Sequence, residues 1–319
     1  MRHPILGLHH VTATVNEAQA DLDFYTELLG LRLIKKTVNF DNHNVYHFYY
    51  GDERGTPGTI WTTFPYAGWS VPPGRHGEGQ ITATSFSVPP GSLPWWSNRL
   101  NDWGVAPRSV SEGGTEQGIA FSDPSGLIIQ MLESGADART PWTGSGIGPD
   151  AAVRGLHSVT LTIAHPAPTV RLLTDLLGFA VVEEGEGFTT LAVNGDAPGH
   201  RFRLLHGAHT GAARNGLGTV HHVALAIASP DQQSELRQEL LRRGHGVTEV
   251  LDRQYFQSIY FREPGGVLLE VATIGPGFAV DETLPHLGRE LKLPPWEEAN
   301  RGAIERALPP VTAPLVTRR

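Results

Sequence analysis

The chain has 319 residues, of which 39% are hydrophobic and 18% charged; this composition excludes wholesale disorder, and the length predicts two domains. The net charge of -8 and the absence of a basic cluster argue against nucleic acid as a partner. There is no cysteine, so disulfides, zinc ribbons, iron–sulfur clusters and thiol nucleophiles are excluded, and any metal must be held by histidine and carboxylate side chains.

The first predicted strand covers residues 9–15 (HHVTATV), where β-branched residues alternate with others. A helix is predicted over residues 21–30 (DLDFYTELLG), because apolar residues recur at helical spacing and a glycine readily adopts the left-handed conformation that ends a helix. The stretches at residues 43–51 and 58–64 predict further strands. One strand, one helix and further strands therefore form a first unit.

The same order recurs three more times along the chain. Strands are predicted at residues 81–88, 156–163 and 220–227. Each precedes a segment of helical spacing that ends in glycine, at residues 93–104, 170–178 and 234–244. Residues 258–272 (SIYFREPGGVLLEVA) predict further strands in the last unit. We therefore expect four units, each built from a strand, a helix and about three strands.

Matching motifs indicate an internal duplication. The interval between GLHHVT at Gly7 and GLHSVT at Gly155 equals the interval between the helix ends at Gly30 and Gly178. The second and fourth units share the related segments DPSGLIIQ and EPGGVLLE. The stretch at residues 134–150 is rich in glycine, proline and aspartate and marks the boundary between the two halves.

The predicted fold class is therefore α+β, with the four units arranged as two tandem repeats. We expect an N-terminal domain at residues 1–137 and a C-terminal domain at residues 151–275. A tail at residues 276–319 falls outside the repeat and contains one short amphipathic helix after Pro295. Two roles are open for this tail: closure over a site, and binding of a partner subunit.

Two histidine pairs open strands at matching places in the first and last units. They are His9–His10 and His221–His222. With a side-chain period of two, His10 lies on the face opposite Val11, and His222 likewise lies opposite its neighbouring valine. Strict alternation would place His9 and His221 on the face away from His10 and His222.

Glu270 lies among apolar residues in the last strand (GGVLLEVAT), where an unpaired carboxylate would be costly to bury. It therefore needs a cation or a hydrogen-bond donor. Two imidazoles and one carboxylate on one face leave about half an octahedron open, as in non-haem Fe(II) oxygenases, although the same ligands also accept Mn(II). We predict a metal site formed by His10, His222 and Glu270, and we interpret His47 as a structural histidine rather than a rival ligand.

The residues at the equivalent positions of the other repeats are not the metal ligands expected here. His10 corresponds to Ala83 and Ser158, and Glu270 corresponds to Gln130 and Thr62. One metal per chain is therefore expected, between the first and fourth units. The second and third units are interpreted as a structural pair.

Five motifs resemble the para-hydroquinone ring-cleaving dioxygenases of the vicinal oxygen chelate superfamily. They are GLHHVT from Gly7, VNFDNHNVYHFYYGDERGTPGTIWTTFP from Val38, GSLPWW from Gly91, VHHVAL from Val220 and DRQYFQSIYFREPGGVLLE from Asp252. The resemblance covers nearly the whole chain. It implies four βαβββ modules whose mixed, curved sheets enclose a metal site, with iron held by His10, His222 and Glu270.

The resemblance also implies further site residues. It assigns catalytic roles to His9, His221, Arg253 and Tyr260, and substrate contacts to these four together with Thr12. The implied reaction is Fe(II)-dependent cleavage of a hydroquinone-type ring by dioxygen, with both oxygen atoms inserted to give a semialdehyde or acid. His9 or His221 would take the phenol proton, because neutral imidazole is the usual base near pH 7, and Tyr260 and Arg253 would stabilise the developing oxyanion.

Three alternatives stay open at this point. Extradiol cleavage of a catechol needs the same metal. A glyoxalase-like isomerase or lyase would use the metal as a Lewis acid, but such sites have a fourth protein ligand, and Thr62 stands at that place. A non-catalytic protein that binds an aromatic molecule would need none of the ligands.

The expected partners are a small aromatic substrate and dioxygen, with a second copy of the chain as a further candidate. No run of about 18 apolar residues occurs, so we expect no membrane span. The N-terminal sequence lacks the pattern of a signal peptide, and we expect a cytoplasmic protein.

Overall fold

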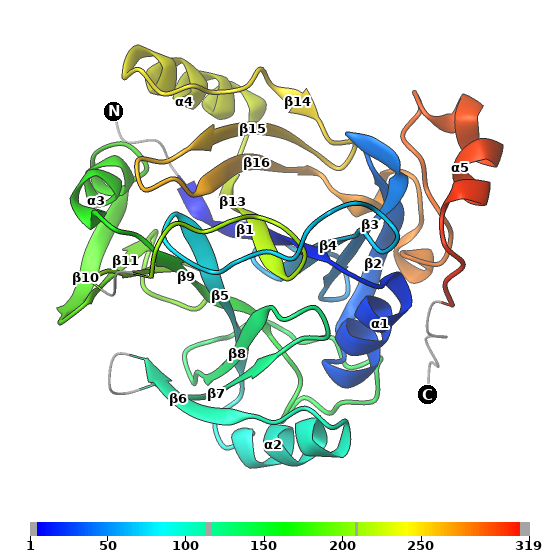
Figure 1. Cartoon of the computed structure of the whole chain (residues 1–319), viewed down its shortest axis with the longest axis horizontal. Coiled ribbons are helices and arrows are strands. Elements are labelled where there is room, and N and C mark those ends of the chain that lie inside the picture. Colours follow the sequence, from blue (N-terminus) through cyan, green and yellow to red (C-terminus); the bar gives the residue numbers. More distant parts are fainter. Residues whose placement is uncertain (1–4, 113–115, 208–209, 313–319) are drawn as a thin grey trace.

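The structure is a computed structural model that describes residues 5–112, 116–207 and 210–312 (Figure 1). The last residues of the predicted tail, 313–319, lie outside the described residues. None of the described helices is long and apolar enough to cross a membrane.

Four modules follow one another along the chain, each with one strand, a helical segment and three strands. The first consists of β1 (Ile5–Val15), α1 (Ala18–Asp23), η1 (Phe24–Leu28), β2 (Arg32–Asn39), β3 (Asn42–Gly51) and β4 (Ile60–Pro65). The second consists of β5 (Gln80–Val88), α2 (Leu93–Asp102), β6 (Arg108–Glu112), β7 (Glu116–Ser122) and β8 (Ile128–Glu133). The predicted order of elements is confirmed in both.

The other two modules repeat the plan. The third consists of β9 (Gly155–Thr162), α3 (Pro166–Asp175), β10 (Phe179–Gly185), β11 (Phe188–Val193) and β12 (Arg201–Leu205). The fourth consists of β13 (Thr219–Ile227), α4 (Pro230–Arg242), β14 (Leu251–Asp252), β15 (Phe256–Arg262) and β16 (Leu268–Pro276). The tail adds η2 (Phe278–Val280), η3 (Leu284–His286), η4 (Glu298–Asn300) and α5 (Arg301–Ala307). The helix expected after Pro295 is thus confirmed, and it lies beside β3 (Figure 1).

Two eight-stranded curled sheets form the fold, and each combines strands from both halves of the chain. One sheet has the order β14-β15-β16-β13-β1-β4-β3-β2, and the other β10-β11-β12-β9-β5-β8-β7-β6. The first module therefore shares a sheet with the fourth, because β1 and β13 pair antiparallel at its centre. The sheets cross the boundary between residues 1–137 and 151–275, and the histidine-bearing strands become direct neighbours.

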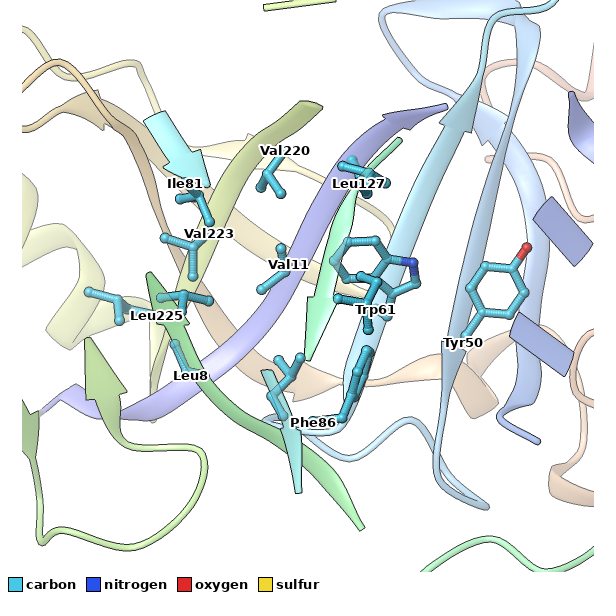
Figure 2. Close-up of a cluster of buried hydrophobic side chains, with 14 of the residues drawn as sticks. Leu8, Val11, Tyr50, Trp61, Ile81, Phe86, Leu127, Val220, Val223 and Leu225 are labelled. Carbon is cyan, nitrogen blue, oxygen red and sulfur yellow. The ribbon is translucent and has the colours of Figure 1, made fainter. Parts of the chain in front are cut away.

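The main hydrophobic core lies between the two sheets. Val11, Trp61 and Val223 of the first sheet surround the same core as Ile81 and Phe86 of the second (Figure 2). All five side chains are buried. Since neighbouring residues of a strand point to opposite faces, burial of Val11 and Val223 in this core directs His10 and His222 to the other face of the sheet.

The first helical segment differs from the single helix expected over residues 21–30. After α1 the chain widens into one π turn, in which the Leu29 amide donates to the Phe24 carbonyl oxygen at 3.0 Å. The segment ends at Gly30, whose φ of 72° lies in the left-handed region. A Cβ at Gly30 would meet the Ile147 side chain at 2.5 Å, so the close approach of the segment between β8 and β9 also requires glycine there.

Asp21 on α1 is a fully buried carboxyl that faces β3 and β4. Its Oδ2 accepts hydrogen bonds from the Tyr50 hydroxyl at 2.6 Å and the Thr63 hydroxyl at 2.5 Å, whereas Oδ1 has no partner. Burial raises the pKa of Asp21 to about 8. Between the ordinary pKa of 3.8 and about 8, the folded protein therefore holds a proton that the unfolded chain has released. Stability from this group falls as the pH rises through that window.

We expect the variant Asp21→Asn, which mimics the protonated carboxyl, to gain stability relative to the wild type as the pH rises. The difference in free energy of unfolding should grow by at most about 1.4 kcal/mol per pH unit between pH 5 and pH 8. Urea unfolding at several pH values measures it, with Asp23→Asn as the control. A difference that does not vary with pH would show that Asp21 is ionised in the folded protein.

Candidate metal centre

Three adjacent strands carry the predicted ligands into one cluster. His10 on β1 lies opposite Ala224 on β13, and Ala224 lies opposite Glu270 on β16. His222 on β13 lies opposite Thr12, which is two residues further along β1 than His10. Glu270 Oε2 lies 3.2 Å from His10 Nε2 and 2.8 Å from His222 Nε2, and the two Nε2 atoms are 3.4 Å apart. All three side chains are buried.

The donor set fits a metal cation. Glu270 Oε1 accepts a hydrogen bond from the Ser258 hydroxyl, whereas the buried Oε2 has no hydrogen-bond partner and faces both Nε2 atoms. Burial works against ionisation of Glu270, but the adjacent His10 and His222 outweigh it and hold its pKa well below the usual range. An ionised, unpartnered oxygen next to two imidazole nitrogens is the arrangement that a divalent metal satisfies.

Two β-bulges change the expected facing of His9 and His221. Between β1 and β13 the register shifts at Leu8/His10, which leaves His9 as an extra residue. A second register shift, between the pair Thr12–His222 and the pair Ala13–Val220, leaves His221 as an extra residue on β13. The bulges interrupt strict alternation, so the rings of both residues lie beside the ring of the following histidine instead of on the opposite face.

Each bulged histidine contacts its neighbour through Nδ1. The Nδ1 atoms of His9 and His10 are 2.9 Å apart, and those of His221 and His222 are 2.7 Å apart. Burial, and then the neighbouring His10, lowers the pKa of His9 to about 3, so His9 is neutral at pH 7, whereas His221 is exposed to solvent. The Nε2 atoms of His10 and His222 are consequently the ones that point toward Glu270.

A cavity of about 490 Å³ opens onto the three ligands. Aromatic and apolar side chains form much of its wall: Phe40, Tyr49, Phe64, Tyr66, Leu251, Phe256, Tyr260 and Leu268. His47, His221 and Arg253 add polar groups. A volume and lining of this kind suit a small aromatic molecule with a few polar substituents.

Arg253 lines the cavity and bridges the two edges of the curled sheet. Arg253 follows β14 at one edge of the sheet, and Asp41 follows β2 at the other edge. The Arg253 guanidinium lies 3.2 and 3.4 Å from the two Asp41 carboxylate oxygens, and its Nε donates to the Tyr260 hydroxyl at 3.2 Å. Burial and nearby Glu270 raise the pKa of Tyr260, so its hydroxyl keeps its proton. Arg253 and Tyr260 thus share one wall with His222, whose ring is 5.6 Å from that of Tyr260.

The structure brings most of the predicted site residues together. His10, His222 and Glu270 form the cluster, and His221, Arg253 and Tyr260 line the cavity. His9 and Thr12 are not among the described lining residues: His9 is buried beside His10, and Thr12 accepts a hydrogen bond from Thr62.

Sequence reasoning missed three contributors to the site. His47 lines the cavity from β3, Asp41 pairs with Arg253, and the Ser258 hydroxyl binds Glu270. Ser258 precedes Tyr260 by two residues on β15, so period-two alternation could have placed it on the same face. No signal in the sequence pairs Asp41 with Arg253, because their loops meet only through the curvature of the sheet.

The tail reaches the wall of the cavity without contributing to its described lining. The Trp296 ring packs against Phe40, with ring centroids 5.6 Å apart, and Glu297 pairs with His43 at 3.1 Å. Phe40 itself lines the cavity. The tail therefore supports the turn between β2 and β3 from outside.

Comparison with known proteins identifies relatives over the whole chain. The Glyoxalase/Bleomycin resistance protein/Dioxygenase superfamily matches residues 7–95 and 155–271. MhqE of Bacillus subtilis (strain 168), provisionally named as a ring-cleaving dioxygenase, is 42% identical over 95% of this chain and 98% of its own length. The chlorohydroquinone/hydroquinone 1,2-dioxygenase of Sphingobium indicum is 34% identical over 95% of each chain.

Two solved structures are similar to this chain to different degrees. A Bacillus subtilis protein provisionally named as a dioxygenase superimposes with a TM-score of 0.93 at 39% identity, over 98% of this chain and 99% of that one. Glyoxalase I from Zea mays superimposes with a TM-score of 0.62 at 14% identity, over 84% of this chain and 92% of that one. The second likeness concerns the fold alone.

Proposed function

The chain belongs to the Glyoxalase/Bleomycin resistance protein/Dioxygenase superfamily and is a ring-cleaving oxygenase, and on this premise we propose that it cleaves hydroquinone-type para-diphenols with an Fe(II) cofactor. The observation that carries the proposal is the unpartnered Glu270 Oε2 beside two imidazole nitrogens at the floor of an aromatic-walled cavity. The relative from Sphingobium indicum, named for hydroquinone substrates, supports the choice of ring.

His10, His222 and Glu270 would hold the metal. Bound Fe(II) would supply the electron transfer between an electron-rich ring and dioxygen that the two cannot carry out alone. The chain contributes by keeping Glu270 ionised and by fixing each imidazole ring through its Nδ1 contact with the preceding histidine. His9 in this proposal acts on the reaction by orienting His10.

His221 and Tyr260 would bind the oxygens of the substrate. When His222 holds the metal through Nε2, its Nδ1–H donates to His221 Nδ1, so His221 carries its own proton on Nε2 and would donate it in a hydrogen bond to a substrate oxygen. In this tautomer His221 cannot also take the phenol proton. The Tyr260 oxygen accepts from Arg253 Nε, so its own proton is free to be donated to a substrate oxygen. The Arg253 charge adjacent to Tyr260 stabilises negative charge that develops on that oxygen.

Dioxygen uptake after anaerobic reconstitution with Fe(II) tests the proposed function. Hydroquinone, methylhydroquinone and catechol are compared side by side, with the metal content measured in the same samples. We expect iron-dependent uptake that is faster with the para-diphenols than with catechol. Faster uptake with catechol would change the assignment to extradiol cleavage. A bound metal without uptake on any of the three would contradict ring cleavage of diphenols.

A further inference from the structure

His47 is a cavity residue that the proposed mechanism leaves without a role. It lies in the middle of β3, in the first module, and its ring packs between Tyr49 and Phe64 at centroid distances of 4.0 and 4.3 Å. The ring lines the same cavity as the metal ligands but comes from a different wall. It is therefore held rigidly where a bound ring would contact it.

A chain of hydroxyl groups fixes which nitrogen of His47 carries the proton. Thr62 Oγ1 donates its only proton to Thr12 Oγ1 at 2.9 Å. His47 Nε2 lies 2.9 Å from the same Thr62 oxygen, so Nε2 must be the donor in that contact. Burial lowers the pKa of His47 well below its usual range, so the ring carries this one proton only. Nδ1 is left with its lone pair.

His47 Nδ1 can therefore accept a hydrogen bond but cannot donate one. It has no hydrogen-bond partner among the described residues, and the ring borders the cavity. Two phenols on the cavity wall have the opposite character. The oxygens of Tyr260 and Tyr66 accept from Arg253 and Asn39, which leaves their protons for a ligand. A ligand that matches the cavity presents an acceptor to the tyrosines and a donor to His47.

We infer that His47 is a specificity-determining residue: its Nδ1 accepts a hydrogen bond from the second hydroxyl of the substrate, so that the cavity prefers a ring with a free hydroxyl there to one with an ether. This inference rests on the proposed function, because it presumes a diphenol in the cavity. Thr12 then acts on the substrate through Thr62 and His47, without touching it.

Anaerobic calorimetry on the Fe(II)-reconstituted enzyme tests this inference without turnover. The probes are hydroquinone and 4-methoxyphenol, which differ in that 4-methoxyphenol carries a methyl group in place of the proton on its second oxygen. One neutral hydrogen bond predicts that the wild type binds hydroquinone about three- to tenfold more tightly. In His47→Phe, which keeps a ring between Tyr49 and Phe64, the ratio of the two dissociation constants should fall to about one.

Two further variants complete the test. His47→Asn retains an acceptor oxygen near the position of Nδ1 and should keep part of the preference. His206→Phe is the matched control, because His206 also contacts a threonine hydroxyl, that of Thr189 at 3.4 Å, but directly follows β12 of the other sheet. It should keep the full preference. Thermal melting of each variant shows whether it is folded.

A preference for hydroquinone that persists in His47→Phe would overturn the inference and leave the proposed function intact. Equal binding of both compounds by the wild type would also overturn it. If the wild type binds neither compound, the inference fails together with the para-diphenol substrate. Dioxygen uptake with catechol then shows separately whether ring cleavage survives.

Discussion

Replacing Glu270 by glutamine is expected to cut both metal affinity and dioxygen uptake by more than about 100-fold. Loss of a residue that merely supports a metal ligand typically costs about 10- to 100-fold, and loss of a ligand should exceed that. The glutamine amide keeps the size of the side chain and can still accept the Ser258 hydrogen bond. It removes the negative charge that faces His10 and His222.

Iron content per chain and dioxygen uptake, measured on the same reconstituted samples, check this expectation. Glu116→Gln is the matched control, because Glu116 also lies beside a histidine, His157 at 3.3 Å, but in the other sheet. It should leave iron content and uptake near the wild-type values. Full iron occupancy with wild-type uptake in Glu270→Gln would show that the metal lies elsewhere, whereas full occupancy with lost uptake would separate binding from catalysis.

Replacing Lys35 by methionine is expected to destabilise the folded protein by about 3–5 kcal/mol. Lys35 on β2 is 0% exposed, and its Nζ lies 2.5 Å from both Asp281 and Glu282 of the tail. Loss of the ammonium leaves two carboxylates beside each other, and the Glu282 side chain is only 3% exposed. Removal of one partner from a buried ion pair carries this cost because the remaining charges stay buried without compensation.

Urea unfolding of Lys35→Met measures the loss. Lys36→Met is the control, because Lys36 is the next residue on β2 and is only partly buried; it should lose less than about 1 kcal/mol. Adding Asp281→Asn and Glu282→Gln to Lys35→Met removes the uncompensated charges and should recover most of the stability. A single variant as stable as the wild type would show that the tail is not held by this ion pair.

The modules and the ligands could be predicted because both are local or repeated signals. Period-two alternation placed His10 and Glu270 on defined faces of their strands, and the repeated histidine pair indicated which strands belong together. The buried neighbours Val11 and Val223 fixed the same facing in the structure. The resemblance to a known family then supplied Arg253 and Tyr260, which composition and spacing alone do not single out.

The bulges at His9 and His221 could not be predicted from alternation. A bulge depends on the register between β1 and β13, which lie more than half the chain apart in the sequence. Each bulge turns a side chain that alternation assigns to the core toward the neighbouring histidine. The interpretation of His47 as structural did not anticipate that its ring lines the cavity. The ring reaches the cavity only through the curvature of the first sheet, which is a property of the tertiary structure.

By itself the sequence determined the four modules, their duplication and the three metal-binding candidates, since hydrophobic periodicity and repeated motifs act within one strand or one module. Only the tertiary structure decided that the first module completes its sheet with the fourth, that Asp41 meets Arg253 across that sheet, and that Lys35 anchors the tail. These contacts join residues separated by more than 200 positions. They depend on how the sheets pair and curl, which no local pattern encodes.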